Sequence, residues 1–226
     1  MSRALRPLAA VPRWVVLGLA LSLGAQLCWQ MTSSSRVSDA PDPPHPPGAQ
    51  ALRLASFGEH EAASRLAMVY IQSYPSLDSR LLGWLRAALE TDPLGQYPLF
   101  LAARVYAETA DTERARMALE FVYQGFLRDP NRRWRWLAHA ALLAKHRLKD
   151  MPLARRYAQA LERNTTAREI PAWARQMEIF ILEDMNELEA AKIMIASLLQ
   201  SGLVHDPAEL RFLIERLEAL EAKSGR

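Results

Sequence analysis

The sequence predicts an all-α protein in which antiparallel helical hairpins are stacked in chain order and one transmembrane helix precedes them. Of the 226 residues 50% are hydrophobic and only 9 are glycine, a composition that favours helices. No stretch alternates β-branched and polar residues over the length that a strand needs. Prolines stand at the ends of the helical stretches, where a missing amide donor costs least. These prolines are Pro75, Pro93, Pro130, Pro152, Pro171 and Pro207.

The N-terminal segment has the layout of a signal-anchor helix. Residues 1–13 contain three arginines and no acidic residue, and the next charged residue is Arg36. The apolar stretch 14–29 would reach about 24 Å at ~1.5 Å per residue, slightly less than a hydrocarbon core of ~30 Å. We therefore predict a transmembrane helix over residues 14–31.

The arginines ahead of this helix determine its predicted orientation. Because basic residues stay on the cytoplasmic side, residues 1–13 are expected in the cytoplasm and the helical domain beyond the membrane, in the periplasm if the protein is bacterial. A cleaved signal peptide has the same layout and would also export the domain. Cys28 is the sole cysteine, so an internal disulfide and a cysteine-based metal site are both excluded.

Residues 32–50 form a predicted linker between the N-terminal helix and the folded domain. Serine and proline dominate it, and the run Asp42–Pro47 favours an extended, polyproline-type spacer. The same run is compatible with a ligand for proline-recognition domains, which is a second interpretation of this segment.

Residues 51–226 are expected to form an α-helical domain. Helices of about three turns joined by short connections pack as antiparallel neighbours. The segment Asp206–Glu209 has the pattern of a capping box at the start of the last helix. The predicted helices are Ala51–Phe57, Glu59–Ser73, Asp78–Thr91, Gln96–Thr109, Thr112–Arg128, Pro130–Leu148, Pro152–Arg163, Pro171–Met185, Glu187–Ser201 and Pro207–Ala222.

The net charge of +3 conceals an uneven distribution along the domain. Residues 112–168 contain thirteen basic and five acidic side chains, whereas residues 169–226 contain six basic and eleven acidic ones. A basic block of this kind produces a local field that attracts an anionic partner, or it is simply a solvated face.

The predicted helix that begins at Pro130 lies at the centre of the basic block. Asp129 is placed to cap its first turn, and Pro130 suits the first helical position. One face, at i, i+3, i+4 and i+7 spacing, is expected to pack. That packing face consists of Trp134, Leu137, Ala138, Ala141, Leu142, Lys145 and Leu148. A second stripe consists of Trp136, His139, Leu143, His146 and Arg147.

Small residues recur along the domain at similar spacing. Ala102, Tyr106 and Ala115 stand in the order small residue, aromatic, alanine, and Ala154 and Ala190 follow Ala115 at successive intervals of 39 and 36 residues. In this respect residues 97–202 resemble tetratricopeptide repeats, in which such a pattern recurs every 34 residues. The resemblance implies a tetratricopeptide-like solenoid of helical hairpins.

The resemblance also implies a binding face, since tetratricopeptide repeats bind peptides along the concave surface of their first helices. Aromatic and arginine side chains, which dominate interface hot spots, occur at several of the corresponding positions. By position, the candidate groove consists of Tyr97, Phe100, Arg104, Trp136, His139, Leu143, His146, Arg147 and Arg175. Glu108, Ile179 and Glu183 occupy further positions of the same register.

The sequence favours an interaction protein over an enzyme. It contains no glycine-rich phosphate loop, nucleophile elbow or Cys–His pair, and His139 and His146 stand about 10 Å apart on one helix. We expect no cofactor and no metal. The predicted function is a membrane-anchored scaffold or adaptor for a protein or peptide partner in the cell envelope. The alternative is binding of an anionic membrane surface or nucleic acid through the basic block 112–168.

Overall fold

The computed structural model describes residues 13–33, 43–74, 77–202 and 204–224. The chain divides into two compact units, Met1–Pro43 and Pro44–Arg226. All regular structure within the described residues is helical, and these residues contain no strand. The all-α part of the prediction is therefore confirmed.

The first unit contains helix α1 (Arg13–Ser33). None of the helices in the described part of the chain combines the length and the apolar character that a membrane crossing requires. The predicted transmembrane signal-anchor helix is therefore wrong, and so is the localisation as a single-pass membrane protein. The predicted cytoplasmic segment 1–13 lies almost entirely outside the described residues. The physical reason is the short apolar stretch, residues 14–29, which covers only about 24 Å of a ~30 Å hydrocarbon core.

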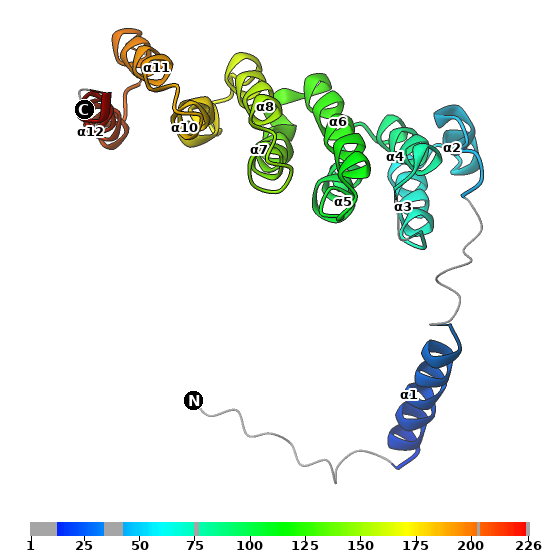
Figure 1. The fold of residues 1–226 in the computed structure, drawn as a ribbon. Helices are drawn as coiled ribbons and strands as arrows, with labels where there is room; N and C mark the ends of the chain where they lie inside the picture. The colour runs from blue at the N-terminus through cyan, green and yellow to red at the C-terminus, as the bar shows by residue number, and fades with distance from the viewer. Residues whose placement is uncertain (1–12, 34–42, 75–76, 203, 225–226) are drawn as a thin grey trace, which may run out of the picture. The chain divides into compact units, whose positions relative to one another are not determined.

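The second unit, Pro44–Arg226, consists of helices joined by short connections (Figure 1). Eight of the ten predicted helical segments correspond to one helix each. The helices are α2 (Ala49–Ala55), α3 (His60–Ile71), α4 (Ser79–Thr91), α5 (Tyr97–Leu101), a π-helical turn (Ala102–Tyr106), α6 (Thr112–Arg128), α7 (Pro130–His146), α8 (Met151–Asn164), α9 (Ala172–Arg175), α10 (Met177–Asp184), α11 (Leu188–Gln200) and α12 (Pro207–Ser224).

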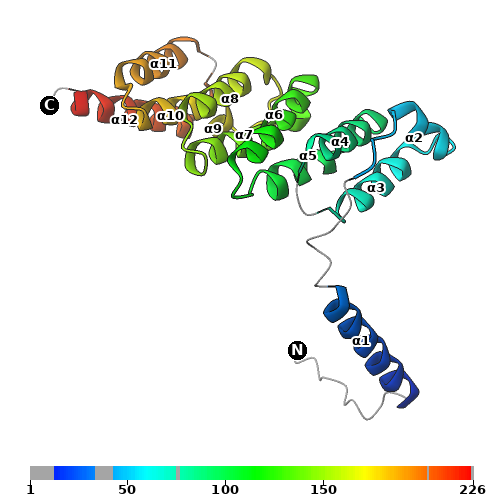
Figure 2. The same ribbon diagram turned by 45° about the vertical axis from the view of Figure 1, so that its right-hand side comes forward.

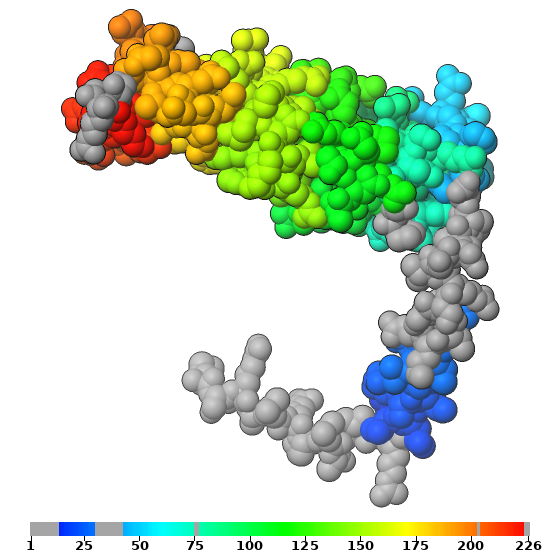
Figure 3. Space-filling model, in the orientation of Figure 1, coloured from blue at the N-terminus to red at the C-terminus, as the bar shows by residue number. Residues whose placement is uncertain are grey.

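Helices α3, α5 and α7 form one row of this unit, and α4, α6 and α8 form a second row (Figures 1 and 2). Successive helices contact each other: α3 packs on α4, α7 on α8, and α10 on α11. The space-filling view shows the same chain-order succession from α2 to α12 (Figure 3). Such packing occurs in many helical arrays, so the tetratricopeptide resemblance remains a prediction.

Aspartates begin four of the helices and explain where they start. The side chains of Asp78, Asp111, Asp129 and Asp150 each accept a hydrogen bond from a backbone amide of the first turn of α4, α6, α7 and α8. These bonds satisfy amides that have no partner within the helix, and a negative charge is favourable at this end of the helix dipole.

Alanines allow the two rows to approach closely. Ala102, Ala118, Ala141 and Ala154 are fully buried where neighbouring helices meet. The backbone of Gly125 in α6 lies against Leu99, and a Cβ added there would be 2.6 Å from the Leu99 Cδ2 atom. One apolar core extends from α3 to α10, and a second joins α10, α11 and α12.

Two predicted helices depart from regular geometry. The segment predicted as 96–109 contains a π-helical turn, in which the Ala107 amide donates to the Ala102 carbonyl at 2.9 Å. The segment predicted as 171–185 is divided at Gln176. The buried side-chain amide of Gln176 donates to Glu209 of α12 at 2.5 Å, so a contact with a helix more than thirty residues later accompanies this division.

Candidate partner-binding face

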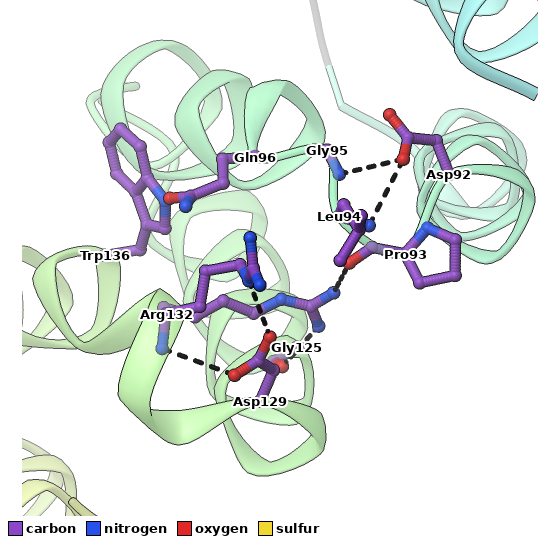
Figure 4. A network of polar contacts seen from close by, with 10 residues as sticks. Asp92, Pro93, Leu94, Gly95, Gln96, Gly125, Asp129, Arg132 and Trp136 are labelled. Carbon is purple, nitrogen blue, oxygen red and sulfur yellow. Dashed lines mark hydrogen bonds and ion pairs between the residues drawn. The ribbon is translucent and has the colours of Figure 1, made fainter. Parts of the chain in front are cut away.

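Trp136 of α7 lies at the seam between α5 and α7. Its indole Nε1–H donates to the Oε1 atom of Gln96 at 2.8 Å (Figure 4). The ring of Phe100 packs edge-on against the indole with centroids 5.8 Å apart, and Tyr97 stacks on Phe100 at 5.7 Å. Tyr97 and Phe100 are 46% and 36% exposed. We call Tyr97, Phe100 and Trp136 the aromatic row.

The loop between α4 and α5 positions Gln96, and through it Trp136. The Asp92 carboxylate accepts hydrogen bonds from the amides of Leu94 at 3.2 Å and Gly95 at 3.1 Å (Figure 4). These bonds fold the loop back toward the end of α4. The backbone of Gln96 is therefore held at a position from which its side chain reaches the Trp136 indole.

Arg133 of α7 attaches this loop to the end of α6. Its side chain is 2% exposed, and its two terminal nitrogens donate to the Gly125 and Pro93 carbonyls, both at 2.7 Å. Burial lowers the pKa of the Arg133 guanidinium from its ordinary value. A buried charge that bonds only to backbone carbonyls is a structural clamp, so Arg133 is not available to a partner.

A polar cluster continues the seam beyond the aromatic row. Glu108 Oε1 lies 3.6 Å from Arg104 Nη1 and 3.6 Å from His139 Nε2. Burial lowers the pKa of His139, the positive charge of Arg104 lowers it further, and the negative charge of Glu108 opposes the shift. His139 is therefore neutral at pH 7, and the Arg104–Glu108 pair supplies the local charge.

The structure brings six of the nine predicted groove residues together along this seam. They are Tyr97, Phe100, Arg104, Trp136, His139 and Arg147.

The other three predicted groove residues differ from these six in their surroundings. Leu143 is partly buried against the core, and His146 is exposed near the end of α7. Arg175 donates to the Ile170 carbonyl at 3.2 Å, within its own segment. Two further register positions are also occupied inside the fold: Ile179 is buried, and Glu183 is paired with Arg216.

A hollow between α7 and α10 was not predicted. It has a volume of about 270 Å³ and is lined mainly by apolar side chains, including Leu142, Trp173 and Phe180. Trp173 packs edge-on against Trp134 with centroids 5.7 Å apart, and Lys145 forms an ion pair with Asp184. We call this space the α7–α10 hollow.

The prediction had assigned Leu142 and Trp134 to the packing face. Leu142 is instead 43% exposed, whereas Trp134 is partly buried and packs against the core. The spacing of Arg135, His139, Leu142 and His146 puts all four on one stripe of α7, but it does not show whether a neighbouring helix covers that stripe.

A second hollow lies on the other side of the aromatic row, between α3 and α5. Its volume is about 480 Å³, and Met68, Val69 and Tyr97 contribute to its lining. Gln72, which directly follows α3, donates to the Tyr97 hydroxyl at 2.6 Å. We call this space the α3–α5 hollow, and we call the two hollows with the aromatic row between them the binding face.

On the α7 side of the binding face, cations exceed the acidic groups that could neutralise them, whereas the lining of the α3–α5 hollow includes Glu61, Arg65 and Asp92. Glu108 pairs with Arg104, and Asp184 pairs with Lys145. Among the residues that the structure describes, Arg135 and Arg147 have no carboxylate partner. Arg135 lies over the Trp134 ring, 5.5 Å from its centroid, and Arg147 donates to a backbone carbonyl. The α7 side of the binding face is therefore complementary to negative charge.

The rest of the basic block 112–168 is largely neutralised by specific ion pairs. On α6, Arg116 pairs with Asp150, and on α8, Arg155 pairs with Glu178 and Glu187. Acidic partners are likewise present for Arg114, Arg128, Arg132 and Arg156. Ion pairs with specific acidic partners thus offset the charge of six basic residues of the block.

Comparisons with protein-family models, with curated proteins and with solved structures find no match for this chain. The geometry of the binding face is therefore the basis for an assignment of function.

Proposed function

We propose that this protein is a helical scaffold that binds an extended segment of a partner protein along the binding face. The observation that carries the proposal is the partly exposed aromatic row of Tyr97, Phe100 and Trp136, with the α3–α5 hollow beside Tyr97 and the α7–α10 hollow across α7. Partly exposed aromatic side chains beside apolar hollows are typical anchors of protein interfaces.

The chemistry of the face defines the kind of segment that fits. The α7–α10 hollow is lined by Leu142, Trp173 and Phe180, which favours an apolar side chain of the partner. Arg135 lies over Trp134, which packs against Trp173 of this hollow, and Arg135 has no carboxylate partner among the described residues, which favours an acidic side chain beside the apolar one. Arg147 lies at the α5–α7 seam, where it donates to the Thr109 carbonyl and likewise has no carboxylate partner in the described part of the chain. The proposed ligand is therefore an extended acidic segment with at least one large apolar residue.

The face is held in position before a partner arrives. Arg133 attaches the α4–α5 loop to α6, Gln96 in that loop accepts the Trp136 N–H, and Phe100 packs on the indole. Side chains that are already fixed lose little conformational entropy on binding, which increases affinity without additional contacts.

Peptide binding by the full chain tests this proposal. Fluorescein-labelled peptides with a central Leu or Phe would carry either acidic or basic flanks, and anisotropy would report the dissociation constant. We expect the acidic set to bind and the basic set not to bind. The variant Arg135→Glu should weaken acidic-peptide binding by at least about tenfold, because a charge reversal opposes the partner directly.

Two control variants have matched chemistry elsewhere on the chain. Arg163→Glu reverses an exposed charge on α8, and Leu127→Ala removes an exposed apolar side chain on α6. Neither should change the affinity by more than about twofold, whereas Phe100→Ala should reduce it about tenfold or more. The proposal would be contradicted if the control variants lost as much affinity as Phe100→Ala, or if acidic and basic peptides bound equally well.

A further inference from the structure

The proline-rich segment before α2 is docked on α4. The indole Nε1–H of Trp84 donates to the Pro44 carbonyl at 2.9 Å. The ring of Pro46 lies so close to Gly83 that a Cβ added to this glycine would be 2.6 Å from the Pro46 Cγ atom. Gly83 therefore provides the space that the Pro46 ring occupies.

Aromatic rings of α3 form a wall beside this contact. Tyr70 lies 5.0 Å from Trp84 between ring centroids, and Tyr74 packs edge-on against Tyr70 at 5.5 Å. The two tyrosine hydroxyls are hydrogen-bonded at 2.8 Å. Two of these rings, Tyr70 and Trp84, also line an apolar hollow of about 240 Å³ between α2, α3 and α4.

The docked backbone is held extended by its own composition. Proline fixes φ near −65°, and a residue that precedes proline is restricted to extended conformations. His45 and Pro46 both precede a proline, and Gly48 at the end of the run has φ −61° and ψ 151°. These values are those of a polyproline II helix, in which carbonyl groups point outward and no internal hydrogen bond forms.

The groups on α3 and α4 match the needs of such a backbone. A polyproline II segment offers flat apolar rings and unpaired carbonyl acceptors. Trp84 supplies the donor, the rings of Tyr70 and Trp84 supply the apolar wall, and Gly83 admits a proline ring. Aromatic grooves with this combination are a general means of binding proline-rich segments.

We propose that Tyr70, Gly83 and Trp84 form a recognition site for proline-rich extended segments. The segment Pro44–Pro47 of the chain is its resident ligand, and a proline-rich segment of another protein displaces it. The resident ligand is attached through α2, so its effective concentration is on the order of millimolar, and it competes with any external segment. The adjacent apolar hollow gives a longer external segment contacts that the resident one lacks.

The variant Gly83→Ala in the full chain tests the resident contact. Alanine is a better helix former than glycine, so the variant should keep or raise the thermal midpoint of the domain. Its Cβ should nevertheless expel Pro46. We expect the NMR signal of the Trp84 indole N–H to shift and its hydrogen exchange to become at least about tenfold faster, as the hydrogen bond to Pro44 is lost.

A second experiment tests recognition of an external segment. The full chain with Pro44, Pro46 and Pro47 all replaced by Gly would be titrated with a synthetic peptide of residues 43–48. We expect this peptide to bind the triple variant on the order of tenfold more tightly than the unmodified chain, because the competing segment is released. Adding Gly83→Ala or Trp84→Phe to the triple variant should abolish binding, and an all-alanine peptide of equal length should not bind.

Two results would overturn the proposal. One is an unchanged Trp84 indole signal and exchange rate in the Gly83→Ala variant. The other is a triple variant that keeps the thermal midpoint of its parent but does not bind the 43–48 peptide. Neither result would affect the binding face on α5 and α7, because the two sites share no residue.

Discussion

At the scale of single residues, Arg133 and His139 show how burial changes the role of a side chain in a basic segment. Arg133 lies between the exposed arginines Arg132 and Arg135 in sequence, and the basic pattern alone gives no reason to distinguish it. The structure buries it, and its guanidinium donates to the Pro93 carbonyl of the α4–α5 loop and to the Gly125 carbonyl of α6.

We predict that Arg133→Met destabilises the domain by about 2–4 kcal/mol, because the Gly125 and Pro93 carbonyls lose their charged donor. The neighbouring Arg132→Met, which removes only an exposed ion pair with Asp129, should cost less than about 1 kcal/mol. Urea unfolding of both variants measures the difference. Equal midpoints would contradict the clamp role of Arg133.

We predict that His139 makes the domain less stable in mild acid. Its pKa in the folded state is lowered by burial and by Arg104 from the ordinary value of 6.5. Below that value the unfolded chain takes up a proton that the folded chain does not, so the free energy of unfolding falls as the pH decreases from about 6.5 toward the folded-state pKa. At pH values well above 6.5, the contribution of His139 to the free energy of unfolding is constant.

The comparison of His139→Gln with the exposed-position control His146→Gln checks this sign. Thermal midpoints at pH 7.5 and pH 5.5 should differ less in His139→Gln than in the unmodified chain. The control should retain the full difference. If both variants keep the same pH dependence as the parent, the His139 environment is not responsible for it.

At the scale of helices, close packing depends on a few small residues. Gly125 and Gly83 are both helical glycines whose added Cβ would meet another atom at 2.6 Å, but the neighbours differ. Leu99 against Gly125 is fully buried between α5 and α6, whereas Pro46 against Gly83 belongs to a segment at the surface that can move away.

We predict opposite effects of the same substitution at these two glycines. Gly125→Ala should lower the stability by about 1–3 kcal/mol, because the overpacked Leu99 cannot leave the core. Gly83→Ala should be neutral or stabilising by up to about 1 kcal/mol, because helix propensity improves and Pro46 moves out. Calorimetry measures the thermal midpoints of the two variants. A similar decrease of the midpoint in both variants would contradict the prediction that their effects are opposite.

Much of the helix pattern could be predicted because its causes are local. Aspartate caps and helix-initial prolines place the starts of α4, α6, α7 and α8 within one or two residues of the prediction. The division at Gln176 could not be predicted, since it accompanies a buried bond to Glu209 on a helix distant in sequence.

At the scale of the whole molecule, the candidate face was predicted in part. Repeat register and helical periodicity selected Tyr97, Phe100 and Trp136, which the structure brings together. Periodicity cannot tell which of two adjacent stripes of α7 the next helix covers, so it places the exposed Leu142 on the packing face and does not identify Trp173. Counts of charged residues also could not identify the cationic part of the face, because they do not show which arginines have acidic partners.

The predicted transmembrane helix is wrong because of the length and apolar character of the helix, and not because of its position in the chain. Charge and hydropathy gave the correct position of a helix, Arg13–Ser33, but not its ability to cross a bilayer. The proposed scaffold function therefore concerns only the helical unit Pro44–Arg226 and its binding face.

Site-specific photo-crosslinking in the native cell tests the binding face most directly. A photoreactive residue would replace Leu142 on α7, which is 43% exposed, or the control Leu127 on α6, which is 41% exposed. We expect one discrete crosslinked protein from position 142 and none from position 127, and the crosslinked segment should be acidic with a large apolar residue. Identical crosslinks from both positions, or a discrete partner from position 127 alone, would contradict the assignment.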